Sequence, residues 1–143
     1  MKIQITIPIV PKAQARDRIT ARGGFARSYK DKKQRLAEDT LLTLLMSHKP
    51  LVPFTGEVSL RIKVYVATPK SKPRKWRETA LRAIYPIRPI TKPDVDNYAK
   101  QILDVMSGTF FEDDRQVVDL SISKFYGEIP RWEIILTGEY ENA

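Results

Sequence analysis

The sequence predicts an α+β fold in which a mixed four-stranded sheet is covered by helices mainly on one face. Two observations support this class. Segments that alternate apolar and polar residues are separated by segments with helical spacing, and 143 residues with 42% hydrophobic content suffice for one core. No internal repeat or linker interrupts the pattern, so residues 1–143 are expected to form a single domain.

The first half of the chain is expected to contain two strands and one helix. Residues 2–9 alternate isoleucine with polar residues, and a proline within them predicts an edge strand. Residues 12–33 lack a sustained period and are interpreted as a mobile basic loop. Residues 29–48 have helical spacing, and residues 58–66 form the clearest strand. The buried stripe expected for this helix is Ala37, Leu41, Leu44, Leu45 and His48, with His48 a helix-end residue rather than a metal ligand.

A basic segment and a second helix follow. Residues 73–83 favour a short helix, within an excursion that could cross a substrate, and residues 87–91 are expected to be extended. The ring of Pro93 disfavours a helical conformation at the residue before it, so the next helix should begin just afterwards. Its buried stripe would be Val95, Ala99, Ile102 and Met106, and Gly108 suits its end.

The end of the chain is expected to form two strands. The third strand is defined by Val118, Leu120 and Ile122, and the fourth by Trp132, Ile134 and Leu136. Because only a turn at residues 127–130 separates them, these strands are predicted to form a hairpin.

The charge distribution indicates a polyanionic partner. The chain carries a net charge of +8, divided into +15 over residues 1–92 and −7 over residues 93–143. A basic surface beside an acidic pocket is typical of metal-dependent chemistry on a phosphodiester, because phosphate attracts cations and the metal needs carboxylates. With no cysteine and one histidine, any metal must be held mainly by oxygen.

No apolar run reaches the roughly 18–20 residues of a membrane span, so the expected compartment is the cytoplasm.

Two acidic groups stand out in the second half. Asp94 lies at a helix start, where aspartate is also a favoured cap, and Asp96 with Lys100 could be an ordinary i,i+4 pair. Residues 112–114 read Glu-Asp-Asp and, taken alone, favour a solvated turn. Taken together, the groups meet the requirements of a Mg²⁺ site, and Lys100 could face the same pocket.

These residues carry a family resemblance. The motif comprises Lys92, Pro93, Asp94, Val95, Asp96, Asn97, Lys100, Asp104 and the run Glu112 to Val118. It resembles the signature of the RusA family of Holliday junction resolvases. The resemblance implies that Asp94, Asp96, Asp114 and Lys100 are catalytic. It also implies metal ligation by Asp94, Asp96, Asp113 and Asp114, with Mg²⁺ as cofactor and Mn²⁺ as a possible substitute.

The resemblance also implies a biological setting. It predicts a homodimer that resolves four-way DNA junctions, or other branched DNA, by paired symmetric nicks in recombination and repair. A two-fold axis would present two identical sites to two strands. The expected location is the cytoplasm, in association with the nucleoid, in a bacterium, prophage or phage.

The candidate DNA-binding residues fall into two basic segments. They are Arg16, Arg18, Arg22 and Arg27 in the N-terminal loop, and Lys72, Arg74, Lys75 and Trp76 in the excursion. A solvated basic face is the alternative for the loop. Trp76 could stack on an unpaired base or pack on its own domain. The aromatic residues Tyr98, Phe110 and Phe111 are assigned to the core or the dimer surface.

Two other functions fit the composition. A non-catalytic basic nucleic-acid-binding protein would use its acids only as caps and solvated turns, and would bind junctions with steep salt dependence without cutting them. A protein-interaction domain would dock a basic partner on its acidic part and would show no affinity for DNA at low salt.

Overall fold

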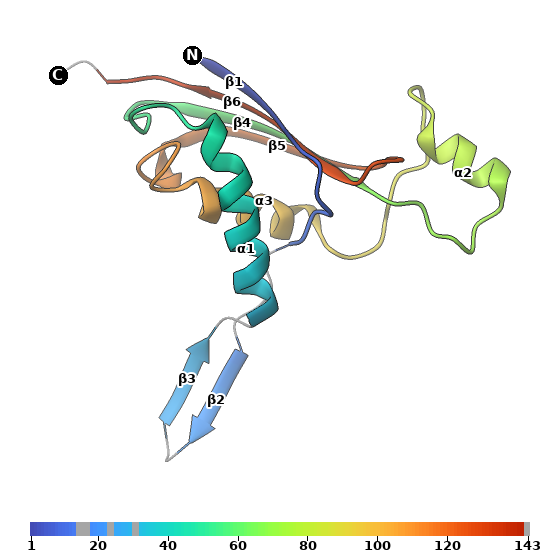
Figure 1. The fold of residues 1–143 in the computed structure, drawn as a ribbon, viewed down its shortest axis with the longest axis horizontal. Coiled ribbons are helices and arrows are strands. Elements are labelled where there is room, and N and C mark those ends of the chain that lie inside the picture. The colour runs from blue at the N-terminus through green and yellow to red at the C-terminus, as the bar shows by residue number, and fades with distance from the viewer. Residues whose placement is uncertain (14–17, 23–24, 30–31, 142–143) are drawn as a thin grey trace.

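A four-stranded sheet and two helices beneath it form the body of the computed structural model (Figure 1). The structure describes residues 1–13, 18–22, 25–29 and 32–141. The sheet contains β1 (Lys2–Ile7), β4 (Val58–Val66), β5 (Val117–Tyr126) and β6 (Arg131–Gly138), and the helices are α1 (Lys32–Leu45), α2 (Arg74–Leu81) and α3 (Val95–Met106). Because α1 and α3 lie on one face of a mixed sheet, the predicted α+β class is confirmed.

The order of the strands is β1-β6-β4-β5, which corrects the predicted hairpin at the end of the chain. Strand β4 lies between β5 and β6: Ile62 pairs with Ile122 in the parallel direction and with Ile134 in the antiparallel direction. The connection passes the end of β4, where the N–H of Gly127 donates to the carbonyl of Val66 at 2.9 Å. A short turn therefore joins two strands that are not neighbours. Strand β1, as expected, is at an edge and ends before its proline.

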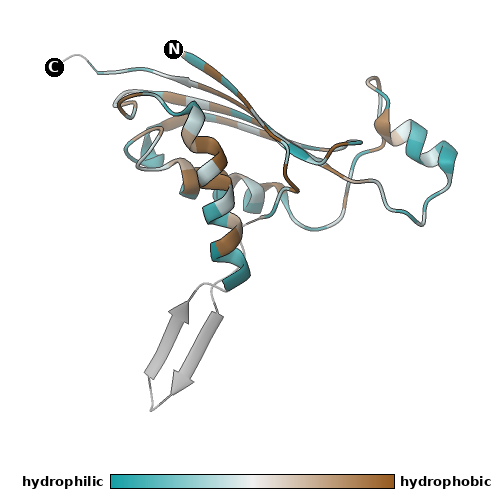
Figure 2. Ribbon diagram, viewed as in Figure 1, coloured by the Kyte–Doolittle hydropathy of each residue, from teal (hydrophilic) through white to brown (hydrophobic). Residues whose placement is uncertain are grey.

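The core lies between the sheet and the two helices, where the apolar sides of α1 and of the strands contribute to it (Figure 2). Its largest fully buried side chains include Trp132, Phe54, Phe110, Phe111, Leu41, Leu45, Ile102 and Met106. Phe110 and Phe111 are thus core residues, as is Tyr98. Three stripe predictions were wrong, because Leu44 is 39% exposed, Val95 is 42% exposed at the helix start, and His48 is also exposed.

A buried polar contact joins the two helices. The side chain of Gln34 on α1 donates from Nε2 to Oε1 of Gln101 on α3 at 2.8 Å. Both side chains are buried, and a buried amide is tolerated when it is hydrogen-bonded. The contact fixes α3 relative to α1.

Part of the loop expected at residues 12–33 is an antiparallel hairpin in the structure, and residues 14–17, 23–24 and 30–31 of that loop lie outside the described residues. Strand β2 (Arg18–Arg22) pairs with β3 (Phe25–Tyr29), and the hairpin projects from the body beyond the start of α1 (Figure 1). The two residues between the strands are both glycine in the sequence and lie outside the described residues. The strands are only five residues long, too short for their periodicity to have been recognised.

The remaining elements are a short helix and two single 3₁₀ turns. Helix α2 lies beyond one end of the sheet, and the turns are η1 (Met46–His48) and η2 (Asp114–Gln116). His48 ends the first of these turns, as expected for a helix-end residue. None of the helices in the described part of the chain is long and apolar enough to cross a membrane.

Candidate functional site

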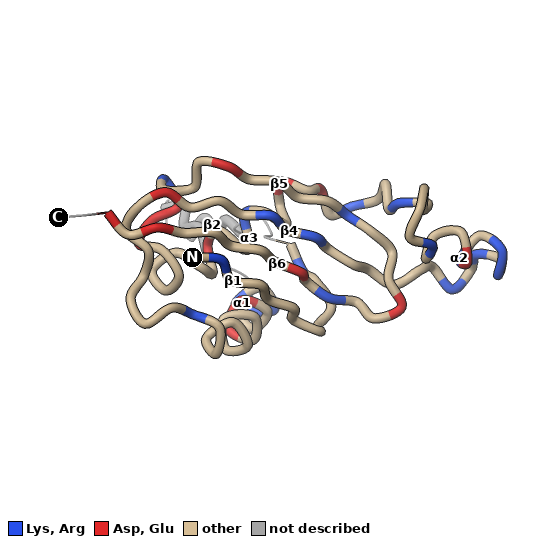
Figure 3. Tube along the Cα trace, turned by 90° about the horizontal axis from the view of Figure 1, so that it is seen from above, with Lys and Arg blue, Asp and Glu red and all other residues tan. Residues whose placement is uncertain are grey.

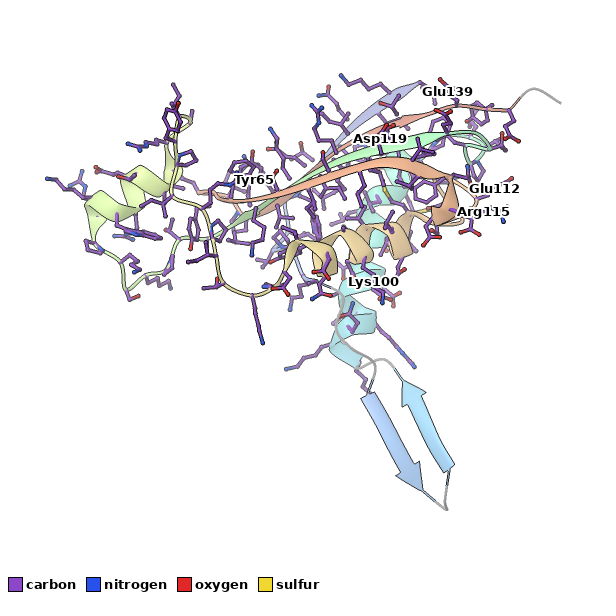
Figure 4. All side chains as sticks on the ribbon, turned by 180° about the vertical axis from the view of Figure 1, so that it is seen from behind. Tyr65, Lys100, Glu112, Arg115, Asp119 and Glu139 are labelled. Atoms are coloured by element: carbon purple, nitrogen blue, oxygen red, sulfur yellow. The ribbon has the colours of Figure 1, made fainter. Side chains whose placement is uncertain are left out.

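Helix α3 carries a row of charged side chains on its outer side. Its buried side comprises Tyr98, Ala99, Ile102, Val105 and Met106, which face the core. Asp96, Lys100 and Asp104 follow one another at intervals of four residues, so they share the opposite side of the helix, and all three are exposed. Figure 4 shows Lys100 on the side of α3 that faces away from the sheet.

Asp94 occupies the N-cap position of α3 but is not used as a cap. The helix begins with the N–H of Tyr98 donating to the backbone carbonyl of Asp94 at 3.3 Å. The Asp94 side chain makes no capping hydrogen bond and is exposed. Its carboxylate oxygens are therefore available to a ligand beside the positive end of the helix dipole.

The second acidic group is a capped turn. It follows the buried Phe111 and leads through η2 into β5. The carboxylate of Asp113 accepts from the N–H of Arg115 at 3.3 Å, and the N–H of Asp113 donates to Oε1 of Gln116 at 2.8 Å. This reciprocal pair is a capping box, which satisfies backbone donors at the start of the turn.

Gln116 also fixes this turn to the body of the protein. Its Nε2 donates to the carbonyls of Phe54 and Gly56 at 2.8 Å and 3.0 Å. These bonds join segments some 60 residues apart in the chain. The acidic turn is therefore held by tertiary contacts and not only by its local sequence.

A hydrogen bond between their side chains shifts the pKa values of Asp113 and Asp114 in opposite directions. The pKa of Asp114 is raised, first by a hydrogen bond with the Asp113 carboxyl, then by partial desolvation and by the charges of Asp113 and Asp104. The pKa of Asp113 is lowered, first because Asp114 donates that hydrogen bond to it. The two carboxyls therefore titrate as an interacting pair, with the pKa of Asp114 above and that of Asp113 below the ordinary carboxyl value.

Asp104 links the row on α3 to the second acidic group. It lies near enough to Asp114 for its charge to raise the pKa of that carboxyl. Asp104 belongs to the family motif, but it was not among the predicted catalytic or metal-binding residues. Asp104 lies four residues after Lys100, which lies four residues after Asp96, and this regular spacing could have identified it.

The predicted metal ligands remain in two groups. Asp113 and Asp114 are together, whereas Asp96 lies at the start of α3, about 12 Å of helix rise from Asp104. Carboxylates on exposed side chains have the donor type that Mg²⁺ prefers. Within the described ranges, no three His, Cys, Asp or Glu side chains form a group that could hold a metal ion. Lys100 lies between the two groups along α3.

A lysine that the sequence did not single out holds the segment before α3. Nζ of Lys124 on β5 donates to the carbonyls of Thr91 and Pro93 at 2.7 Å and 2.9 Å. The second of these carbonyls directly precedes Asp94. Strand β5 thus holds both acidic groups, through Gln116 just before its start and through Lys124 near its end. Spacing along the chain contains no signal for this role of Lys124.

The predicted DNA-binding residues lie on two projecting parts. Lys72, Arg74 and Lys75 are exposed on or just before α2, where Figure 3 shows a concentration of basic residues. Trp76 instead packs edge-on against Tyr126, with the ring centroids 5.4 Å apart, which favours the packing interpretation. The residues Arg18, Arg22 and Arg27 belong to the β2–β3 hairpin, and Arg16 lies outside the described residues.

Comparisons with known proteins agree with this arrangement. The family model described as Endodeoxyribonuclease RusA matches residues 8–137, a range that includes both acidic groups, Lys100, Gln116 and Lys124. The chain is also 38% identical over 136 residues to a protein of Bacillus subtilis (strain 168) described as "Uncharacterized protein YqaN". That match covers 94% of this chain and 94% of the relative.

Proposed function

The chain belongs to the RusA endodeoxyribonuclease family, and on that premise we propose that it is a divalent-metal-dependent resolvase of four-way DNA junctions. One observation carries the proposal most directly: two acidic groups flank Lys100 along the exposed side of α3. A purely structural role does not require Asp94, whose carboxylate makes no capping bond. The same family membership supports branched DNA as the substrate class.

In this proposal the acids hold the metal and Lys100 contacts the phosphate. Asp94 and Asp96 at the start of α3, and Asp113 and Asp114 in the second group, would supply carboxylates for Mg²⁺, or for Mn²⁺ in its place. Because the two groups lie apart along α3, one ion would contact both only if the groups moved closer together. When bound, the ion supplies a Lewis acid and a water of lowered pKa. The ammonium of Lys100 neutralises charge that develops on the scissile phosphodiester.

We also propose that the active form is a homodimer. Resolution of a junction requires nicks in two strands at symmetric positions, and a two-fold axis presents two identical sites. The exposed cations of α2 would contact phosphates, so binding should weaken as the salt concentration rises. The setting would be bacterial or phage recombination and repair, with the protein near the nucleoid.

The substitution Asp96→Asn tests the catalytic assignment. The variant should bind a synthetic four-way junction about as well as the parent and fail to nick it in Mg²⁺. The matched control is Asp39→Asn, which changes an exposed acid on α1 and should leave the rate of nicking at the parental level. Parental cleavage by Asp96→Asn would refute the assignment.

The substrate class is tested with a junction that has a movable core. It is incubated beside plain duplex, fork and flap substrates, with and without Mg²⁺. Paired symmetric nicks in the junction alone support resolution. Tight, salt-sensitive binding without nicks in Mg²⁺ or Mn²⁺ would instead support a non-catalytic nucleic-acid-binding protein.

A further inference from the structure

The loop between α2 and α3 carries an exposed aromatic residue, Tyr85, which is called the aromatic tip below. The side chain of Tyr85 is 84% exposed, and its neighbour Ile84 is 71% exposed. Tyr85 has a φ of +49°, in the left-handed region that bulky residues rarely adopt. Such a conformation persists only where the surrounding structure imposes it, and it often marks a functional position.

Arg82 holds this backbone conformation. Its Nε and Nη2 donate to the carbonyl of Tyr85 at 2.9 Å and 2.7 Å. Two bonds from one guanidinium to one carbonyl orient the peptide plane at the tip. The loop is held through the backbone carbonyl of Tyr85. The hydroxyphenyl ring is therefore left exposed to solvent.

Both ends of the segment that carries the tip are anchored on β5. Before the tip, Trp76 packs against Tyr126. After the tip, Nε of Arg88 donates to the carbonyl of Lys124 at 2.9 Å, and its guanidinium lies 4.2 Å from the centroid of the Phe125 ring. The aromatic tip is therefore supported on both sides, beyond the end of the sheet (Figure 1).

The charge around the tip is almost entirely positive. Residues 67–92 contain eight lysines and arginines and one acid, Glu78, which pairs with Arg74 at 2.9 Å. Figure 3 shows these cations along α2 and the loop that follows it. An exposed aromatic ring among cations suits a nucleic acid, because bases stack on the ring while phosphates contact the cations.

We propose that Tyr85 is a platform on which an unpaired base of branched DNA stacks. The inference rests on the proposed function and adds a contact specific for the branch point, since the bases of continuous duplex are already stacked on one another. It also moves the proposed stacking contact from Trp76 to Tyr85, because Trp76 packs against Tyr126 and anchors the segment. The cations nearby hold the adjoining phosphates in any sequence context.

The test removes the ring and keeps the backbone. Tyr85→Asn is the informative variant, because asparagine tolerates the left-handed region. Tyr85→Phe keeps the stacking face, and Leu51→Ala changes a side chain that is 99% exposed elsewhere. Binding is measured in EDTA to a four-way junction and to a matched duplex, with 2-aminopurine at a branch-point position of the junction.

We expect Tyr85→Asn to bind the junction about tenfold more weakly than the parent and the duplex equally well, within the range measured for base stacking on aromatic side chains. The protein-induced change in 2-aminopurine fluorescence should be lost in this variant. Tyr85→Phe and Leu51→Ala should behave like the parent.

Three results would overturn the inference. One is parental junction affinity for Tyr85→Asn, and another is an equal loss of affinity for junction and duplex. The third is a change in oligomeric state for Tyr85→Asn in sedimentation, which would assign the tip to a protein contact. If the parent does not prefer the junction over the duplex, the proposed function itself fails, and the two failures are thereby distinguished.

Discussion

The two acidic groups begin alike and are used differently. Asp94 and Asp113 each occupy an N-cap position, before α3 and η2 respectively. Asp113 accepts a backbone hydrogen bond and belongs to a capping box, whereas the Asp94 side chain makes no capping bond. The difference teaches that an aspartate at a helix start is not identified as a cap by its position alone.

The way in which each group is held explains this difference. Before α3, Lys124 binds backbone carbonyls, so no acidic side chain is needed to position the segment. At η2, Gln116 binds both the acidic turn and the carbonyls of Phe54 and Gly56, and Asp113 is part of that arrangement. The side chain of Asp94 is thus not used to hold the fold, whereas Asp113 in the second group helps to hold it.

The largest expected effect is the loss of junction nicking when Asp94 is replaced. Asp94→Asn should reduce junction nicking by at least about 100-fold, beyond the losses typical of residues that only support a metal ligand. Asparagine is as good an N-cap as aspartate, so the melting temperature should be unchanged. Initial rates in Mg²⁺ and thermal unfolding are measured side by side.

Asp94→Ala tests through thermal stability whether the two aspartates differ as caps. Because the Asp94 side chain makes no capping bond, alanine should lower the melting temperature much less than Asp113→Ala does. A larger loss of stability for Asp94→Ala than for Asp113→Ala would contradict the distinction between the two groups.

An intermediate effect is expected at Gln116. Replacing it with alanine removes the donor to two carbonyls and the acceptor for the N–H of Asp113, and should lower the free energy of unfolding by about 1–3 kcal/mol. Urea unfolding measures this loss. Gln4→Ala, at an exposed position on β1, is the matched control and should change stability little. Parental stability of Gln116→Ala would exclude the anchoring role.

The smallest effect concerns the pH dependence of stability. The pKa of Asp114 is raised above the ordinary value of 3.8, so its contribution to stability is present below that pH and is lost as the pH rises through its folded pKa. The lowered pKa of Asp113 acts in the opposite sense, and its contribution is lost as the pH falls. The two contributions largely oppose each other in the parent.

Asp114→Asn separates these contributions. Relative to the variant, the parent should lose stability as the pH rises from about 3.8, where Asp114 begins to ionise beside Asp113. Urea unfolding across this range measures the difference, and carboxyl NMR should show the upper of two coupled titration steps disappear in the variant. A parent and variant with parallel pH profiles would contradict the raised pKa of Asp114.

Much of the candidate site could be predicted from sequence, because its residues are close together in the chain. The start of α3 after Pro93, the row of Asp96 and Lys100, and the acidic run before β5 all follow from local rules. The anchoring role of Lys124 and the backbone conformation of Tyr85 could not be predicted. They depend on carbonyls more than thirty residues away and on an arginine that imposes a left-handed backbone.

The sequence by itself determined the α+β class, the bounds of β4, the helix that carries Asp96 and Lys100, and the family motif, because periodicity, proline and residue type act over a few neighbouring positions. Only the tertiary structure decided that β4 lies between β5 and β6 and that Gln116 joins the acidic turn to Phe54. Strand order and anchoring depend on hydrogen bonds between residues about 60 apart, and local patterns do not specify which distant partners meet.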